Sequence, residues 1–189
     1  MKKILYSCAL ITALLMQACT NNSSDSNEND TTAMQQQVAP TDDNVTNQRD
    51  TIFTTKAAIS GIAEVELGKM ALEKAVNAKV KAFATMMVND HAKANEELKT
   101  LATNKGIILP NMLDGEHAGK RDKLNSKSGT DFDRAYADEM FHSHRKTLKL
   151  MEDGSKDLKD NELKGFAAKT APIVRHHLEM IVKIKEELK

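Results

Sequence analysis

The chain has 189 residues, of which 29% are charged and 40% hydrophobic, and its formal net charge is zero. A neutral chain lacks the basic surface on which nucleic-acid binding depends, so we expect no nucleic-acid partner. Only 3 prolines and 8 glycines interrupt the sequence, which leaves too few turn residues for an all-β fold. The composition therefore indicates one helical domain with additional segments.

The first residues have the pattern of a bacterial export signal. Two lysines precede an apolar run over 4–16, which is too short to span a membrane comfortably and is typical of a signal peptide. Ala18 directly before Cys19 resembles a lipoprotein cleavage site. We expect residues 1–19 to be a lipoprotein signal peptide whose Cys19 carries the lipid; simple secretion and an uncleaved anchor are the alternatives. Lipid on Cys19 would hold the chain to a membrane of the bacterial cell envelope, on the periplasmic or outer-membrane side.

Residues 20–50 are acidic and polar. They contain six acidic residues, one basic residue and no aromatic residue. Such a segment cannot bury enough apolar surface to offset the entropy that ordering would cost. We therefore expect a disordered tether that separates the membrane from a domain formed by residues 51–189.

From residue 51 onward, apolar residues recur with the 3.6-residue period of helices. The pattern predicts four helices, over about 51–76, 77–105, 130–153 and 160–188. The first two follow each other almost directly, as do the last two, so each pair should pack antiparallel. A connection of 23 residues between the pairs is long enough to run the length of a helix. The predicted fold class is therefore all-α, a ferritin-like four-helix bundle of two antiparallel hairpins joined by a long crossover.

A short internal repeat supports this arrangement. The stretch "VKAFA" at 80–84 returns as "LKGFA" at 163–167, and each copy leads to a histidine, His91 and His177. The second copy needs a three-residue insertion to bring the two histidines into register. Together with the hairpin pattern, the repeat indicates duplication of a helix pair.

Four polar residues fall on apolar stripes near the centres of the four predicted helices, and they are Glu64, His91, His144 and His177. The centres of helices in a bundle share one layer whichever way each helix runs, so these side chains should converge. Glu64 lies in a stripe of small residues that would let another helix approach closely. Glu66, on the neighbouring stripe, is the alternative carboxylate.

Three imidazoles and a carboxylate can hold one ion of iron, zinc or copper. Met87 and Met140 each lie one turn before a histidine and add thioethers that suit Cu(I), although methionine is also a common core residue. The Glu-x-x-His steps of a standard di-iron site are absent, and no nucleophile with a neighbouring base is evident. The pattern therefore predicts a metal site and no catalytic residue, and it leaves open whether the protein is an enzyme.

Several stretches of the chain resemble the domain of unknown function 4142 family: "AEVELGKMALEKA", "VKAFATMMVNDHAKANEEL", "FDRAYADEMFHSHRKTLKLMED" and "LKGFAAKTAPIVRHHLEM". The resemblance covers about residues 52–188. It implies a ferritin-like fold and a place among proteins labelled as outer-membrane or periplasmic, but no reaction and no protein partner. We expect an envelope-tethered bundle that binds a metal ion in metal handling or stress response. The alternative is a non-catalytic structural or interaction lipoprotein whose histidine layer only sets packing.

Overall fold

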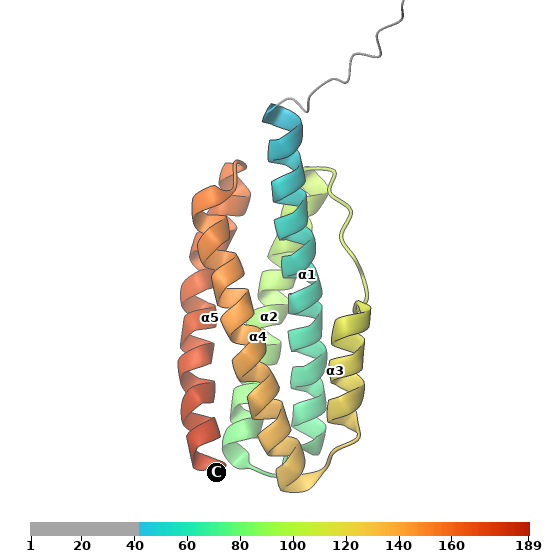
Figure 1. The fold of residues 1–189 in the computed structure, drawn as a ribbon, viewed down its shortest axis with the longest axis vertical. Coiled ribbons are helices and arrows are strands. Elements are labelled where there is room, and N and C mark those ends of the chain that lie inside the picture. The colour runs from blue at the N-terminus through green and yellow to red at the C-terminus, as the bar shows by residue number, and fades with distance from the viewer. Residues whose placement is uncertain (1–41) are drawn as a thin grey trace, which may run out of the picture. The chain divides into compact units, whose positions relative to one another are not determined.

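The computed structural model describes the backbone of residues 42–189 and the side chains of residues 48–189. These residues form five helices and no strand, which confirms the all-helical prediction. The helices are α1 (Asp42–Lys74), α2 (Ala78–Asn104), α3 (Gly115–Asn125), α4 (Gly129–Asp157) and α5 (Asn161–Glu187) (Figure 1). The predicted signal peptide, Cys19 and most of the predicted tether lie outside the described residues.

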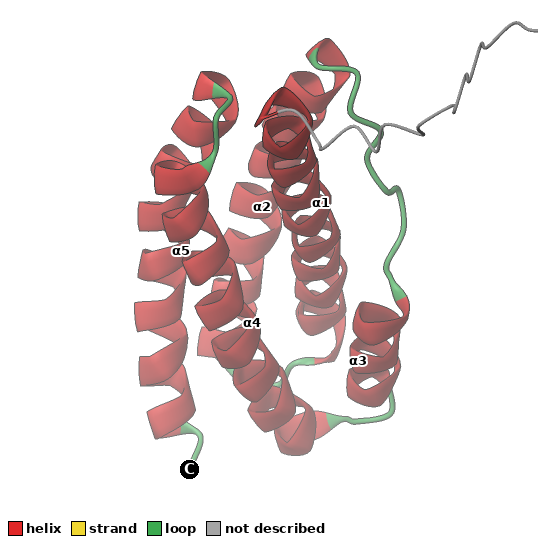
Figure 2. Cartoon of the chain, turned by 45° about the horizontal axis from the view of Figure 1, so that its top comes forward, coloured by secondary structure: helices red, strands yellow, loops and turns green. Residues whose placement is uncertain are grey.

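The four long helices form two antiparallel pairs. α1 packs along α2, and α4 packs along α5; α1 also lies beside α4, and α2 lies beside α5. The connection between the pairs contains α3, which packs against α1 and α4 at the outside of the bundle (Figure 2). The crossover therefore contains a short helix, which covers one side of the bundle.

The first helix begins earlier than the apolar pattern predicts, at Asp42 rather than near residue 51. Asp50 does not cap this helix, because it lies within it and is buried. Its carboxylate accepts hydrogen bonds from the backbone N–H groups of Lys159 at 3.2 Å and Asp160 at 3.1 Å. An acidic residue assigned to the tether by composition therefore fixes α1 to the turn between α4 and α5.

Asp133 on α4 makes the equivalent contacts at the turn between α1 and α2. Its carboxylate accepts hydrogen bonds from the backbone N–H groups of Asn77 at 2.8 Å and Val76 at 3.2 Å, between α1 and α2. Asp133 follows Asp50 by 83 positions, and Asp160, the N-cap of α5, follows Asn77, the N-cap of α2, by the same 83. The two helix pairs are therefore an internal repeat with a constant offset, and each pair caps the turn of the other.

This offset corrects the alignment expected from the sequence. It matches Phe83 with Phe166 without any insertion, but it matches His91 with Val174. His91 and His177 are therefore not equivalent positions of the repeat, and the predicted three-residue insertion is wrong. The helices and turns follow the repeat, whereas the histidines lie at positions that break its symmetry.

The end predicted for the third helix is also wrong. α4 continues through Gly154 to Asp157. Gly154 is buried, and a Cβ atom there would lie 2.6 Å from a ring carbon of Phe53 on α1. This glycine is needed where α1 approaches α4 rather than as a helix stop.

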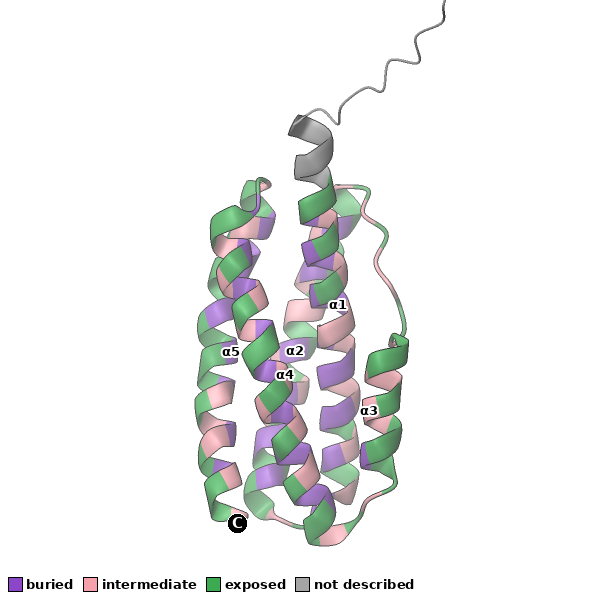
Figure 3. Cartoon of the chain, in the orientation of Figure 1, coloured by how far each residue is buried: buried purple, intermediate pink, exposed green. Residues whose placement is uncertain are grey.

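Buried side chains line the inward faces of the four long helices (Figure 3). They form two apolar clusters, one around Phe83, Phe132 and Met140 and the other around Phe53 and Phe166. Along each long helix, buried polar residues lie between the members of the two clusters: one on each of α1, α2 and α5, and two, His144 and Thr147, on α4. The core therefore consists of two apolar halves with a polar layer between them.

Candidate metal centre

The polar layer consists of Glu64 on α1, His91 on α2, His144 on α4 and His177 on α5. Their exposed fractions are 2%, 5%, 0% and 1%. Each long helix contributes one ionisable side chain from the middle of its inward face, and α4 adds the hydroxyl of Thr147 beside Glu64. The four residues predicted to share a layer therefore do come together, as a buried histidine cluster beside Glu64.

The three imidazoles surround one point. One ring nitrogen of each histidine lies within 4.8 Å of the corresponding nitrogens of the other two. The ring centroids are 5.3 Å apart for His91 and His177, and 5.6 Å apart for each pair that includes His144. This spacing brings three nitrogen ligands from three helices within reach of a single ion.

Each histidine also has an outer contact through its other ring nitrogen. Nδ1 of His144 donates to the backbone carbonyl of Met140 at 2.8 Å, and Nε2 of His177 donates to the carboxylate of Asp90 at 3.0 Å. Nδ1 of His91 lies 2.9 Å from Oε2 of Glu64, an ion-pair distance without the alignment of a hydrogen bond. Because carbonyl and carboxylate oxygens only accept, the hydrogen bonds of His144 and His177 place their ring protons on the outer nitrogens.

The inner nitrogens have no such contact. Nε2 of His91, Nε2 of His144 and Nδ1 of His177 are buried and have no hydrogen-bond partner among the described residues. Buried polar atoms in proteins are nearly always paired, because an unpaired one costs about 1–3 kcal/mol. Three such atoms, one from each ring of the cluster, mark a candidate ligand site.

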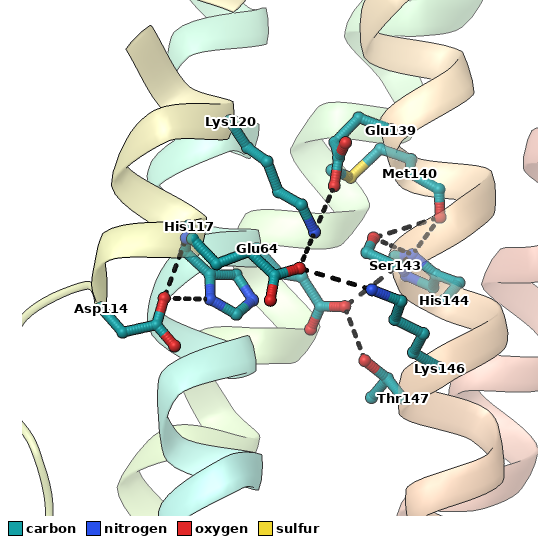
Figure 4. A network of polar contacts seen from close by, with 11 residues as sticks. Glu64, Asp114, His117, Lys120, Glu139, Met140, Ser143, His144, Lys146 and Thr147 are labelled. Atoms are coloured by element: carbon teal, nitrogen blue, oxygen red, sulfur yellow. Dashed lines mark hydrogen bonds and ion pairs between the residues drawn. The ribbon is translucent and has the colours of Figure 1, made fainter. Parts of the chain in front are cut away.

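Glu64 lies at the edge of the cluster. Its Oε1 accepts a hydrogen bond from Thr147 at 3.3 Å and lies 3.8 Å from Nδ1 of His144 (Figure 4). Glu66, the alternative, has a side chain 41% exposed and lies 3.9 Å from Arg121. Glu64 is therefore the carboxylate of the layer.

The electrostatics of the layer favour a cation. Burial opposes ionisation of Glu64, but His91 and His144 outweigh it and lower the pKa of Glu64 to about 2. Burial lowers the pKa of His177 to about 4 despite its hydrogen bond to Asp90, and it also lowers the pKa of His144. The pKa of His91 is raised, because attraction to Glu64 exceeds the effect of burial. At neutral pH the layer therefore holds an ionised carboxylate and at least two neutral imidazoles, the form that binds metals.

Sequence reasoning missed Asp90 and Thr147. Asp90 precedes His91 in the chain but pairs with His177 on α5, so no spacing within one helix reveals it. Thr147 lies three residues after His144, on the same face of α4, and this spacing could have indicated it. His142 is exposed, as its polar surroundings predicted, and His176, at the edge of its apolar stripe, is exposed as well.

Comparison with known proteins assigns the family. The profile of the family described as "Domain of unknown function (DUF4142)" matches residues 33–184.

The chain belongs to this family.

The DUF4142 match includes all four residues of the polar layer and confirms the resemblance seen in the sequence. No curated protein and no solved structure matches the chain. None of the helices in the described part is both long enough and apolar enough to cross a membrane.

Proposed function

We propose that this DUF4142 domain binds one divalent transition-metal ion between His91, His144 and His177. The observation that carries the proposal is the set of three buried, unpaired ring nitrogens, one from each histidine. Three imidazoles with an open fourth position suit zinc, and imidazole also suits iron and copper. The role that follows is handling of a metal ion.

The outer contacts support this proposal. Histidine ligands commonly donate their second ring nitrogen to a carboxylate or a backbone carbonyl, which fixes the tautomer and orients the ring. Asp90 and the Met140 carbonyl supply such acceptors for His177 and His144. We assign Glu64 the outer position next to His91, where its charge would also balance that of the ion.

A purely structural polar layer is the alternative. Such a layer stabilises a bundle when its buried atoms pair with one another, since unpaired atoms cost more than an apolar core. Here the three inner nitrogens and Oε2 of Glu64 have no hydrogen-bond partner among the described residues. This pattern favours a ligand site over a packing device.

We also propose that the bundle is ferritin-like, because two antiparallel pairs joined by a long connection are the arrangement of that fold. A standard di-iron centre draws four carboxylates from its helices. The layer described here contains one carboxylate and three histidines. The proposed site therefore holds a single ion.

We further propose that lipid on Cys19 holds the domain at a membrane of the bacterial cell envelope. The support is the apolar run over 4–16 followed by Ala18 and Cys19. Metabolic labelling with a radioactive fatty acid tests this. The native chain should incorporate label, Cys19→Ser should not, and equal labelling of the two would contradict the proposal.

Elemental analysis of the full chain, purified without an affinity tag, tests the metal site. We expect about one transition-metal ion per chain, because the three histidines surround one point. The ion should be lost in His91→Ala, His144→Ala and His177→Ala. The exposed histidines supply matched controls, so His142→Ala and His176→Ala should retain it. A native protein that holds no metal and takes up none when zinc, iron or copper is supplied would contradict the proposal.

A further inference from the structure

A cavity of about 490 Å³ lies between α1, α3 and α4. Glu64 and Thr147 line it together with apolar side chains that include Ile59 and Leu150. Because Glu64 is 2% exposed, the cavity extends inward to the polar layer. The hydrogen bond between Thr147 and Glu64 places the carboxylate where α1 meets α4.

Glu64 is the member of the polar layer that faces both the cavity and the cluster. It lines the cavity, whereas the three histidines do not. One of its oxygens lies 2.9 Å from His91 and the other 3.8 Å from His144. An ion that reached the inner end of the cavity would therefore meet this carboxylate before any histidine.

The charges along the cavity favour the approach of a cation. Four lysines and four carboxylates other than Glu64 line the cavity, so the charges of its outer part offset one another. Lys120, for example, lies 3.0 Å from Glu116 and 3.2 Å from Glu139. Glu64 contacts no lysine or arginine among the described residues; its charged contacts are the histidines. The charge of Glu64, which only the histidines balance, thus lies at the inner end of the cavity, and a negative charge there draws cations inward.

The outer wall of the cavity is weakly held. Polar contacts join α3 to α4 through Lys120–Glu139 at 3.2 Å and Lys146–Glu116 at 3.4 Å (Figure 4). They join it to α1 through Lys74–Asn125 at 3.2 Å and Arg121–Glu66 at 3.9 Å, all of them between side chains that are at least partly exposed. Of the residues of α3, only Leu124 is buried. Exposed ion pairs contribute about 0–1 kcal/mol each, so α3 can separate from the bundle far more easily than any of the four long helices.

The geometry points to this cavity as the route by which a divalent cation reaches the three histidines, with Glu64 as the residue that receives the ion and passes it inward. α3 is the cover of this route. The inference rests on the proposed metal site. The competing route runs between α2 and α5 beside Asp90, whose side chain is 36% exposed.

Kinetics of zinc exchange in the full chain test the route. Ser60 lines the cavity one turn before Glu64 on α1. In Ser60→Phe, zinc uptake from a chromogenic chelator and zinc release to an excess of chelator should both slow about tenfold or more, because blocking a path changes both rates and leaves affinity unchanged. The dissociation constant should match that of the native protein.

The matched control is Ile173→Phe on α5. Ile173 is 41% exposed and lies one turn before His177, as Ser60 lies one turn before Glu64. It adds an aromatic ring one helical turn from His177, the histidine that contacts Asp90, and should leave both rates unchanged. Should Ser60→Phe fail to fold, Ser60→Cys labelled with a bulky maleimide after folding replaces it, with labelled native protein as the reference for Cys8 and Cys19.

The outcomes separate the route from the site. A native protein that binds no zinc contradicts the proposed function itself. If the Ser60 variant binds zinc and exchanges it at native rates, the proposed route is wrong, whereas the proposed metal site stands. Slow exchange in Ile173→Phe with native rates in the Ser60 variant would overturn the route in favour of the α2–α5 side.

Discussion

The three histidines of the layer differ in how they hold protons, because their outer contacts differ. His91 lies against an ionised carboxylate that favours its charged form, and its pKa is raised. His177 is buried beside two other imidazoles, and its pKa is lowered to about 4. The three rings therefore differ in how readily they take up a proton. A metal ion bound by all three would take the place of these protons with a single shared positive charge.

The metal-free protein should lose stability as the pH falls from 6.5 toward 4. In this window unfolded His177 takes up a proton that folded His177 does not, since its pKa falls from 6.5 to about 4. The loss should be roughly 3 kcal/mol, at 1.36 kcal/mol per pKa unit. His91 does not offset it, because the contribution of a raised pKa is already complete below pH 6.5. Urea unfolding in the presence of a chelator measures this profile.

In His177→Gln the slope in this window should become shallower, because the contribution of His177 is gone; the slope that remains comes from His144, whose pKa burial also lowers. Glu64 adds a further loss only at lower pH, since a carboxylate with a pKa of about 2 loses its contribution as the pH falls below 4.5. A native profile that stays flat between pH 6.5 and 4.5 would contradict the buried neutral state of His177.

Asp90→Asn should weaken metal binding about tenfold, because loss of an outer partner typically costs 10–100-fold in affinity. Asparagine keeps the size of the side chain and removes the charge that orients His177. Competition against a chelator of known affinity measures the change. Asp138→Asn is the control, since Asp138 pairs with Lys185 at the surface of α4 and should have native affinity. Equal metal affinities for the two variants would contradict a role for Asp90 in positioning His177.

At the scale of elements, close approach of helices depends on a few small residues. Added Cβ atoms would lie 1.9 Å from the side chain of Asn95 at Gly61, 2.8 Å from Val88 at Gly68 and 2.6 Å from Phe53 at Gly154. The first two let α2 approach α1, and the third lets α1 approach α4. These contacts hold the four helices close enough for one polar residue from each to meet.

Gly154→Ala should destabilise the protein by about 1–3 kcal/mol, as overpacking a buried contact does. An alanine methyl would clash with the Phe53 ring and also lie 3.2 Å from Cβ of Ala167. Gly165→Ala on α5 is the control, because nothing lies within 4 Å of its added Cβ; it should stabilise by about 0.5–1 kcal/mol. Chemical unfolding measures both, and stabilisation by both substitutions would show that Gly154 is not a packing position.

The sequence predicted the four residues of the layer because each lies on an apolar stripe at a helix centre, where periodicity is informative. It misplaced the start of α1, because Asp50 lies in a stretch with the composition of a tether. It misplaced the end of α4, because glycine commonly ends a helix and Gly154 was predicted to do so. Both are explained by contacts with distant segments, the α4–α5 turn and Phe53. Asp90 was missed for the same reason, because its partner lies on another helix.

At the scale of the molecule, the polar layer divides the core at its middle. The apolar cluster around Phe83 lies on one side and the cluster around Phe166 on the other. A polar layer with unpaired nitrogens weakens the bundle at this level. An ion bound by histidines of α2, α4 and α5 would instead hold these three helices together there. A ligand that binds only the folded state stabilises it by about 2.7 kcal/mol at a hundred times its dissociation constant.

Titration of the full, metal-free chain with Co²⁺, followed by visible absorption, tests the metal site most directly. Tetrahedral nitrogen coordination gives Co²⁺ intense visible bands, which octahedral hydrated Co²⁺ lacks. We predict that these bands rise to saturation at one ion per chain, because three histidines provide one site with an open position. They should be absent in His144→Ala and present in His142→Ala. Addition of Co²⁺ without such bands, or with bands that persist in His144→Ala, would contradict a metal centre in the histidine layer.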